Sequence, residues 1–380
     1  MNKDCQILET DKNTIRILYV NGGILDLGGI SSYMINYFRH IDKSVCHIDF
    51  AVHGNKKGVY DDEIENAGSV IYHLPIKSCD YFGNVRALKK ILQEGNYDII
   101  HSHLDAGSYH ILKIAKQCGV PIRIAHSHNT DFLTSSKLKL FINEYYRKNL
   151  RKVATDFMAC SSEAGKWLFG EKSNFTVVRN AIELDKYKFS AKSREKIRKQ
   201  LGLEEKCIVL GHVGRFDTQK NHSFLIDFFA QLIKKNQNYR LICVGDGHLR
   251  NKIESKAKEL GVYDYICFVG YTENVECFYS AFDIFVFPSL FEGLGIVAVE
   301  AQCAGLPCIL SDAVPKEAVV MNSVKRVSLN EKEWCNAIEE ISVERIATKH
   351  HCFESKGYDI QAESNKLQLL YSSLKQHAIR

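Results

Sequence analysis

The 380-residue sequence lacks several features that would point to a specialised class of protein. It has only 5 prolines and no low-complexity segment, which excludes a collagen-like chain and argues against a disordered one. No apolar run approaches the roughly 18 residues that suggest a membrane-spanning helix. The 50 basic and 45 acidic residues leave a net charge of only +5, which does not indicate a nucleic-acid partner.

Cysteine is plentiful, but its arrangement argues against disulfides and zinc. The chain has 13 cysteines, an odd number, and no Cys-x-x-Cys pair. Cys160, Cys207, Cys243 and Cys267 lie inside apolar runs, so we expect buried free thiols in a reducing compartment. Residues 1–13 are polar and do not resemble a secretory signal, so we expect a cytoplasmic protein.

Short apolar runs alternate with segments of helical spacing along the chain. The strand-like runs are 14–20, 46–52, 69–73, 98–102, 121–126, 154–160, 175–179, 206–212, 239–244, 265–269, 283–287 and 307–310. This alternation predicts parallel sheets with helices on both faces. The pattern restarts after the charged stretch 186–206. We therefore predict an α/β protein with two doubly wound, Rossmann-like domains, 1–185 and 186–359, which face each other across a cleft.

A glycine-rich segment follows the first predicted strand. Gly22-Gly23 ends the strand, and Gly28-Gly29 precedes a predicted helix. Glycine lets backbone N–H groups approach a phosphate or a sugar, and a helix N-terminus adds positive potential. The spacing does not match the dinucleotide fingerprint. The loop is either a ligand contact or an ordinary tight turn of an α/β fold.

Four histidines follow two neighbouring predicted strands: His101, His103, His126 and His128. Histidine is the commonest metal ligand, so a metal site is one interpretation. We expect the two histidines of each strand to point to opposite faces, and only two aspartates lie nearby, so we expect no metal. We predict instead hydrogen bonds to a hydroxylated ligand, with at least two of the four as structural histidines.

Charged residues follow two strands of the second half. After the run 206–212, Arg215 offers a planar fork for phosphate oxygens and Lys220 a mobile point charge. After the run 283–287, glycines predict a tight turn before a small-residue helix, whose free N–H groups can hold a diphosphate. Glu292 lies in this turn and Glu300 in the helix, and carboxylates can accept hydrogen bonds from sugar or ribose hydroxyls. For Glu300, a buried helix anchor is the alternative.

Together these features resemble the retaining glycosyltransferases of family 4, which have the GT-B architecture. The resemblance covers nearly the whole chain. It is carried by Gly28-Gly29, His103, Asn180-Ala181-Ile182 with Phe189, Gly214-Arg215-Phe216 with Lys220, Gly245-Asp246-Gly247, Phe268-Val269-Gly270-Tyr271, Pro288-Ser289 and the pair Glu292 and Glu300. The segment at about 360–380 resembles the last helix of the family, which crosses back onto the N-terminal domain.

The resemblance implies an acceptor on the N-terminal domain and a nucleotide-sugar donor on the C-terminal domain. It implies that Arg215 and Lys220 bind the donor diphosphate, that Glu292 contacts donor sugar hydroxyls and that Glu300 binds the ribose. Further donor contacts are implied for Gly28, Gly29, Tyr271, Val275, Gly293, Leu294, Gly295 and Ile296. His103 is implied near the reacting sugar, and the other candidates in the cleft are His101, His126, His128 and Asn180.

The implied reaction is hexosyl transfer from a nucleotide sugar, with UDP as the base by analogy. A departing diphosphate must be neutralised, and Arg215, Lys220 and a helix N-terminus would do this without a metal or other cofactor. The family retains anomeric configuration, and no carboxylate nucleophile is evident, so front-face attack is implied. The segments RIAHSHN and SSYMINYFRHI resemble the branch that builds bacterial capsule, exopolysaccharide or lipid-linked glycans.

Residues 137–152 are basic, with aromatic side chains interleaved and Glu144 as the one acid. Such a helix can lie on an anionic membrane surface, and a lipid-linked acceptor would suit this position. We therefore expect peripheral contact with the inner face of the cell membrane. The alternative is a solvated helix with a core-facing stripe.

Two other functions are compatible with these residues. One is a GT-B-fold sugar-nucleotide epimerase or phosphorylase, which the full set of Arg215, Lys220, Glu292 and Glu300 disfavours. The other is a non-catalytic sugar-nucleotide-binding subunit of a glycosyltransferase complex. Release of nucleoside diphosphate that requires an acceptor would separate the transferase from both.

Overall fold

The computed structural model describes residues 14–26, 28–132 and 134–379. By residue number, the chain divides into unit 1 (1–128, 132–178 and 361–380) and unit 2 (129–131 and 179–360). The predicted boundary after residue 185 falls a few residues too late. Ile182 belongs to unit 2 because its N–H donates to Tyr358 O at 3.0 Å and it forms an isolated parallel bridge with Asp359. Residues 1–13, for which we expected no secretory signal, lie outside the described residues.

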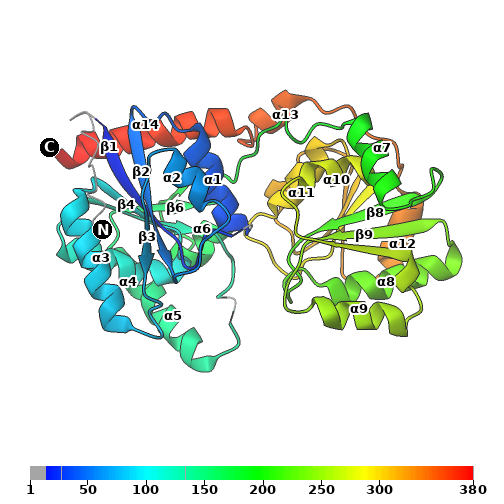
Figure 1. The fold of residues 1–380 in the computed structure, drawn as a ribbon, viewed down its shortest axis with the longest axis horizontal. Coiled ribbons are helices and arrows are strands. Elements are labelled where there is room, and N and C mark those ends of the chain that lie inside the picture. The colour runs from blue at the N-terminus through cyan, green and yellow to red at the C-terminus, as the bar shows by residue number, and fades with distance from the viewer. Residues whose placement is uncertain (1–13, 27, 133, 380) are drawn as a thin grey trace, which may run out of the picture. The chain divides into compact units, whose positions relative to one another are not determined.

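Unit 1 is built on a seven-stranded sheet of order β3-β2-β1-β4-β5-β6-β7, and every neighbouring pair is parallel (Figure 1). Its strands are β1 (Ile15–Val20), β2 (Cys46–His53), β3 (Ile71–Leu74), β4 (Ile99–Ser102), β5 (Ile122–Ser127), β6 (Asp156–Ala159) and β7 (Thr176–Val177). Its helices are α1 (Gly29–His40), α2 (Asp61–Asn66), α3 (Tyr81–Gly95), α4 (Ser108–Gln117), α5 (Lys137–Asn149), α6 (Ser162–Phe169) and α14 (Ile360–Ile379), with the 3-10 turns η1 (Asp105–Gly107) and η2 (Leu150–Lys152).

Unit 2 is built on a six-stranded parallel sheet of order β10-β9-β8-β11-β12-β13. Its strands are β8 (Ile208–Val213), β9 (Tyr239–Val244), β10 (Ile266–Gly270), β11 (Ile284–Phe287), β12 (Cys308–Ser311) and β13 (Val324–Val327). Its helices are α7 (Ala191–Gln200), α8 (His222–Lys235), α9 (Arg250–Glu259), α10 (Val275–Ala281), α11 (Ile296–Cys303), α12 (Glu331–Glu340) and α13 (His350–Glu354), with η3 (Tyr263–Tyr265) and η4 (Lys316–Ala318). The two doubly wound α/β units confirm the predicted fold class.

The sequence patterns did not predict one strand. The edge strand β13 reads VKRV, and all four of its residues are only half-buried. An edge strand needs no continuous apolar run, so the signal that located the other strands is absent. Edge position also explains Cys267 on β10, which is half-buried, whereas Cys160, Cys207 and Cys243 are buried as predicted.

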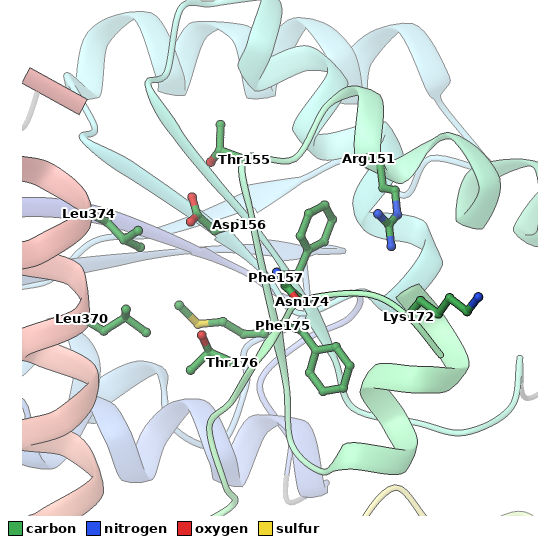
Figure 2. Close-up of a pocket in the computed structure, with 11 residues that line it drawn as sticks. Arg151, Thr155, Asp156, Phe157, Lys172, Asn174, Phe175, Thr176, Leu370 and Leu374 are labelled. Atoms are coloured by element: carbon green, nitrogen blue, oxygen red, sulfur yellow. The ribbon is translucent and has the colours of Figure 1, made fainter. Parts of the chain in front are cut away.

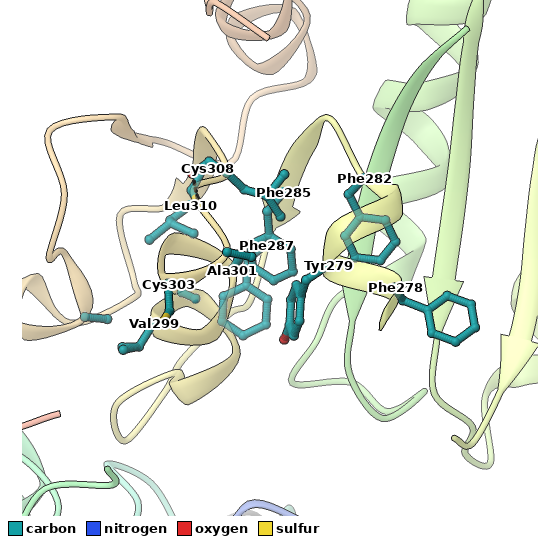
Figure 3. Close-up of a cluster of buried hydrophobic side chains, with 14 of the residues drawn as sticks. Phe278, Tyr279, Phe282, Phe285, Phe287, Val299, Ala301, Cys303, Cys308 and Leu310 are labelled. Carbon is teal, nitrogen blue, oxygen red and sulfur yellow. Dashed lines mark hydrogen bonds between the residues drawn. The ribbon is translucent and has the colours of Figure 1, made fainter. Parts of the chain in front are cut away.

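The core of unit 2 holds α11 at the carboxyl edge of its sheet. Figure 3 shows rings from α10 and β11, among them Tyr279, Phe285 and Phe287, gathered with side chains of α11 such as Val299. A helix enclosed in this way is apolar around most of its circumference. The N-terminus of α11 is therefore fixed by close packing.

The C-terminal helix α14 packs on unit 1. The Tyr371 hydroxyl is buried and lies 2.9 Å from the Tyr19 hydroxyl and 2.7 Å from His101 Nδ1. Lys375 Nζ lies 2.9 Å from an Asp98 carboxylate oxygen. No helix within the described residues is both long and apolar enough to cross a bilayer.

Candidate active site

Each sheet has one switch point at which the strand order reverses, between β1 and β4 in unit 1 and between β8 and β11 in unit 2. Ligands of open α/β sheets bind beyond the carboxyl ends of the strands at such points. The predicted residues follow these same strands: His103 follows β4, Arg215 and Lys220 follow β8, and Glu292 follows β11. The sequence motifs therefore lie where each fold offers a ligand site.

The glycine loop after β1 leads into α1 without a side-chain cap. Gly28 is the N-cap residue, and its N–H donates to an Asp26 carboxylate oxygen at 2.9 Å. A Cβ placed on Gly29 would meet no described atom within 4 Å. Packing among the described residues therefore does not require glycine at position 29, which is compatible with a ligand approaching there.

In unit 2, the structure joins Lys220 and Glu292, which the sequence analysis had found in separate motifs. Lys220 Nζ lies 2.6 Å from Glu292 Oε1, and the two side chains are only 16% and 6% exposed. The ammonium group also lies 4.9 Å from the centroid of the Phe287 ring. Each charge of this buried pair is compensated by the other, so removing either partner leaves an uncompensated buried charge.

Arg215 is joined to Lys220 through a residue that the sequence analysis missed. Asp217 accepts a hydrogen bond from Arg215 Nε at 2.8 Å and another from the Lys220 backbone N–H at 3.2 Å. The loop between them is anchored by buried Phe216, whose N–H donates to Asp246 O at 2.9 Å. A Cβ at Gly247 would lie 2.6 Å from Phe216 O. This glycine of the family motif therefore has a packing role beneath the cationic loop.

The turn before α11 presents backbone amides. Gly295 is its N-cap residue with a φ of +82°, and a Cβ there would lie 3.2 Å from Phe287 Cε1. No side chain caps this helix N-terminus. Leu294 is buried, so a donor contact at that position would use the backbone. Gly293 lies in the same turn, and Ile296 begins the helix.

Glu300 is held inside unit 2 by two tyrosines. Tyr279 OH donates to Oε2 at 2.6 Å, and Tyr187 OH donates to Oε1 at 3.1 Å. Burial raises the pKa of the Glu300 carboxyl, and the two tyrosine hydrogen bonds oppose that shift. A carboxylate has about four lone-pair positions, so these two hydrogen bonds do not use all of them, and the predicted ribose contact stays a prediction. The sequence offered no signal for either tyrosine.

Three further predicted residues, two for the donor and one in the cleft, are not fully buried. Tyr271 follows β10 and is exposed, and Val275 begins α10 and packs partly against the core. Asn180 is half-buried, and its Oδ1 has no hydrogen-bond partner among the described residues. Exposed or unsatisfied groups are suited to ligand contact, and the predicted roles of these three residues stay predictions.

The four histidines correct the sequence analysis, which expected the histidines of one strand to point to opposite faces. Side chains two residues apart share a face, because the side-chain period of a strand is two. The ring centroids of His101 and His103 lie 4.2 Å apart, and those of His126 and His128 also lie 4.2 Å apart. Between the strands, His101 Nε2 lies 2.9 Å from His126 Nδ1, and His103 Nδ1 lies 2.9 Å from His128 Nε2. The result is two hydrogen-bonded pairs stacked on each other.

This arrangement suits hydrogen bonding better than metal binding. Nitrogens of His101, His103 and His126 lie within 4.8 Å of one another, close enough to consider a metal. However, the facing nitrogens of His101 and His126 point at each other, whereas metal ligands converge on a common point. Burial lowers the pKa of all four imidazoles, that of His128 to about 3, so the pairs are uncharged at neutral pH.

The basic segment 137–152 forms α5 and the turn η2. No residue of α5 is fully buried, but Tyr146 packs against the core of unit 1 and Leu150 in η2 is buried in it, which fits the alternative of a solvated helix with a core-facing stripe. Leu138 and Phe141 are 69% and 73% exposed.

A groove of about 550 Å³ lies beside β6, β7 and α14 and is lined by residues such as Phe157, Phe175 and Leu370 (Figure 2). That groove is lined by Arg151 of the segment 137–152 but by none of the predicted donor, catalytic or cleft residues.

Comparisons with known proteins find relatives of one family. The profile "Glycosyl transferases group 1" matches residues 193–345, and the profile "Glycosyltransferase Family 4" matches residues 27–186. The chain is 31% identical to the putative glycosyltransferase EpsF of Bacillus subtilis, over 94% of this chain and 96% of that protein. It is 25% identical to the Escherichia coli UDP-Gal:alpha-D-GlcNAc-diphosphoundecaprenol alpha-1,3-galactosyltransferase, with 75% and 78% covered. It is 27% identical to the capsular polysaccharide biosynthesis glycosyltransferase CapH of Staphylococcus aureus, with 84% and 88% covered.

Solved structures share the fold. Anabaena HepE in complex with UDP and glucose matches with a TM-score of 0.70 at 19% identity, covering 96% of this chain and 98% of that one. The lipopolysaccharide glycosyltransferase WaaG matches with a TM-score of 0.64 at 17% identity, covering 95% and 94%. At these identities the likeness shows the GT-B fold alone.

Proposed function

The chain belongs to the glycosyltransferases of group 1 and family 4, and from this premise we propose that it transfers a hexosyl group from a UDP-sugar to a saccharide or lipid-linked saccharide acceptor. The E. coli relative is named for UDP-Gal and a diphosphoundecaprenol-linked acceptor, and the S. aureus relative for capsular polysaccharide. These names support a role in cell-surface polysaccharide synthesis, and we propose that the reaction takes place in the cytoplasm.

The observation that carries the proposal is the buried Lys220–Glu292 pair at the switch point of unit 2. A leaving nucleoside diphosphate needs positive charge, and a donor sugar needs hydrogen-bond acceptors. Lys220, with Arg215 linked to it through Asp217, supplies the charge. The uncapped N-terminus of α11 adds N–H groups. We propose that these groups suffice without a metal or other cofactor.

The reaction proposed for this site is transfer with retention by front-face attack. The acceptor hydroxyl oxygen forms a bond to the anomeric carbon on the face from which the diphosphate leaves. The bond between that carbon and the phosphate oxygen breaks, and its electron pair stays on the phosphate. The acceptor proton passes to the departing phosphate oxygen. Lys220 and Arg215 stabilise the charge that builds there, and Glu292 accepts hydrogen bonds from the donor sugar.

A thermal-shift panel of nucleoside diphosphates and nucleotide sugars tests the donor site. A ligand at about 100 times its Kd stabilises the folded chain by about 2.7 kcal/mol. We expect a UDP-sugar to shift the wild type but not Arg215→Ala, and to shift Glu292→Ala no further than UDP does. The exposed residues Lys192 and Glu259, each replaced by Ala, are the matched controls. A panel in which no nucleotide sugar shifts the wild type would refute the proposal.

We also propose that α5 contacts an anionic membrane, where a lipid-linked acceptor would be reached. Exposed Leu138 and Phe141 alternate with Lys137 and Lys139 along the helix. Apolar burial and about 1 kcal/mol per basic residue near the surface favour such contact.

Liposome sedimentation at low salt with anionic lipid tests the contact. Leu138→Ser should reduce binding, whereas Leu369→Ser on α14, a leucine equally exposed at 69%, should not. Equal loss in both variants, or no binding by the wild type, would remove the membrane contact from the proposal.

A further inference from the structure

The outer histidine pair of unit 1 has two ring nitrogens that meet no partner among the described residues. These are Nε2 of His103 and Nδ1 of His128. We call this pair outer because both residues follow their strands and His128 keeps 6% exposure, whereas His101 and His126 are fully buried. Buried polar atoms are nearly always satisfied, and the third unpaired ring nitrogen of the cluster, His126 Nε2, belongs to a fully buried residue. The two outer nitrogens are therefore the ones placed to meet a polar ligand.

Hydrogen-bond chemistry fixes what these two nitrogens offer. A neutral imidazole has one N–H and one lone pair. If His103 Nδ1 donates to His128 Nε2, then His103 Nε2 is an acceptor and His128 Nδ1 carries the remaining proton. If His128 Nε2 donates instead, the two outer atoms exchange roles. In both arrangements the pair presents one donor and one acceptor.

We propose that the His103–His128 pair is an uncharged binding unit for saccharide hydroxyl groups, with His128 as a second ligand-binding residue beside His103. A hydroxyl group both donates and accepts, so it matches either arrangement. A phosphate oxygen that carries no proton only accepts, so it would leave the acceptor nitrogen unmatched. The inference deepens the proposed function, since it assigns the saccharide acceptor to these atoms.

The surroundings hold this pair in place. The His128 N–H donates to Asp105 Oδ1 at 2.6 Å, and Asp105 has a φ of +48°. A left-handed conformation costs a residue with a Cβ about 1 kcal/mol or more, and such strain clusters at functional sites. Beneath the outer pair, His101 and His126 form the inner pair, which Tyr371 of α14 anchors at His101 Nδ1.

Tyr33 from α1 completes the site. Its ring centroid lies 5.5 Å from that of His103 and 5.0 Å from that of His128. Its hydroxyl is buried and has no partner among the described residues. Burial raises the pKa of this phenol well above its usual value, so it stays protonated and can donate to a sugar oxygen.

Nitrogen-15 NMR of the full chain with labelled histidine tests the tautomers directly. We expect both rings of the outer pair to be neutral at pH 7, one protonated at the outer nitrogen and the other at the inner one. His128→Gln retains a polar group near the Nε2 position, and His128→Asn retains one near Nδ1, so the two variants assign the signals. His377→Gln, on the exposed face of α14, is the matched control.

Ligand binding is measured on the same variants, with a panel of methyl glycosides and inorganic pyrophosphate as probes. At least one glycoside should bind, and both His128 variants should weaken it about tenfold or more. Pyrophosphate binding should be the same in the wild type and in the His128 variants. His377→Gln should behave as the wild type throughout.

Several results would overturn the inference. One is a charged ring in the outer pair at pH 7, and another is that both outer nitrogens carry a proton or that neither does. The others are Zn²⁺ binding to the four rings and the absence of glycoside binding at about 50 mM. None of these measurements uses sugar transfer or the donor site. Failure of the nucleotide-sugar panel with intact glycoside binding would therefore refute the transferase proposal and leave this one standing.

Discussion

Replacing Glu292 by Gln should tighten the binding of free UDP while it abolishes sugar transfer. The substitution keeps the size of the side chain and removes its charge. Lys220 Nζ then loses the carboxylate that lies 2.6 Å away and is left as a largely buried, unpaired cation. A diphosphate that arrives at this cation no longer competes with a protein carboxylate.

The magnitude follows from the pair geometry. At 2.6 Å and an effective dielectric constant of about 20, the gross Coulomb attraction is about 6 kcal/mol. Desolvation removes much of this, and breaking one partner of a buried pair typically destabilises a protein by about 3–5 kcal/mol. If the diphosphate recovers about a third of that cost on binding, UDP affinity rises by about 1.4 kcal/mol, or tenfold.

Titration calorimetry measures the affinities of the wild type and of Glu292→Gln for UDP and for a UDP-sugar. UDP should bind about tenfold more tightly to Glu292→Gln than to the wild type. The UDP-sugar should lose its advantage over UDP, because Glu292 no longer accepts hydrogen bonds from the sugar. Glu259→Gln, an exposed site on α9, should change neither value. Weaker UDP binding by Glu292→Gln would refute the idea that the Glu292 carboxylate competes with the diphosphate for Lys220.

Three further predictions concern stability. Gln302→Met should lower the free energy of unfolding by urea by about 3 kcal/mol, because this buried amide on α11 makes four hydrogen bonds to backbone groups. The exposed Gln376→Met should cost nothing measurable. Tyr279→Phe should lower stability by about 2 kcal/mol, since it leaves Glu300 Oε2 without its hydrogen bond, and an unchanged unfolding midpoint would contradict that. The four stacked histidines have pKa values in the folded state below the unfolded value of about 6.5. Their contribution to the stability of unit 1 is therefore complete above pH 6.5 and falls as the pH drops towards 3. The unfolding free energy of unit 1 should decline across this window, and a flat profile would contradict the burial of neutral rings.

Sequence predicted the fold because most strands are buried on both faces and therefore read as apolar runs. The edge strand β13 is only half-buried and has no such apolar run, so it was not predicted. Motifs also located Lys220 and Glu292 separately, but 72 residues separate them along the chain, and only the sheet order brings them together. Tyr187, Tyr279 and Gln302 carry no local signal, since a buried polar contact is defined by its partner.

The histidines illustrate a different limit. The side-chain period of two places His101 and His103 on one face of their strand, so the prediction of opposite faces was wrong. What sequence could not supply is the register that aligns β4 with β5, which pairs His101 with Ile124 rather than with a histidine. That offset lets the rings meet nitrogen to nitrogen between strands, which makes two hydrogen-bonded pairs out of four residues.

The two switch points differ in charge, and the difference matches the chemistry proposed for them. In unit 2, a cation held by a carboxylate suits a ligand that carries phosphate charge, because the ligand can replace the carboxylate. In unit 1, four neutral rings suit a ligand without charge, because an ion would stay uncompensated among buried imidazoles. A diphosphate and a saccharide are thus selected by different physics on the two sheets. Unit 1 therefore disfavours a bare diphosphate, whereas unit 2 offers a cation for the diphosphate and, in the proposed reaction, a carboxylate for the donor sugar.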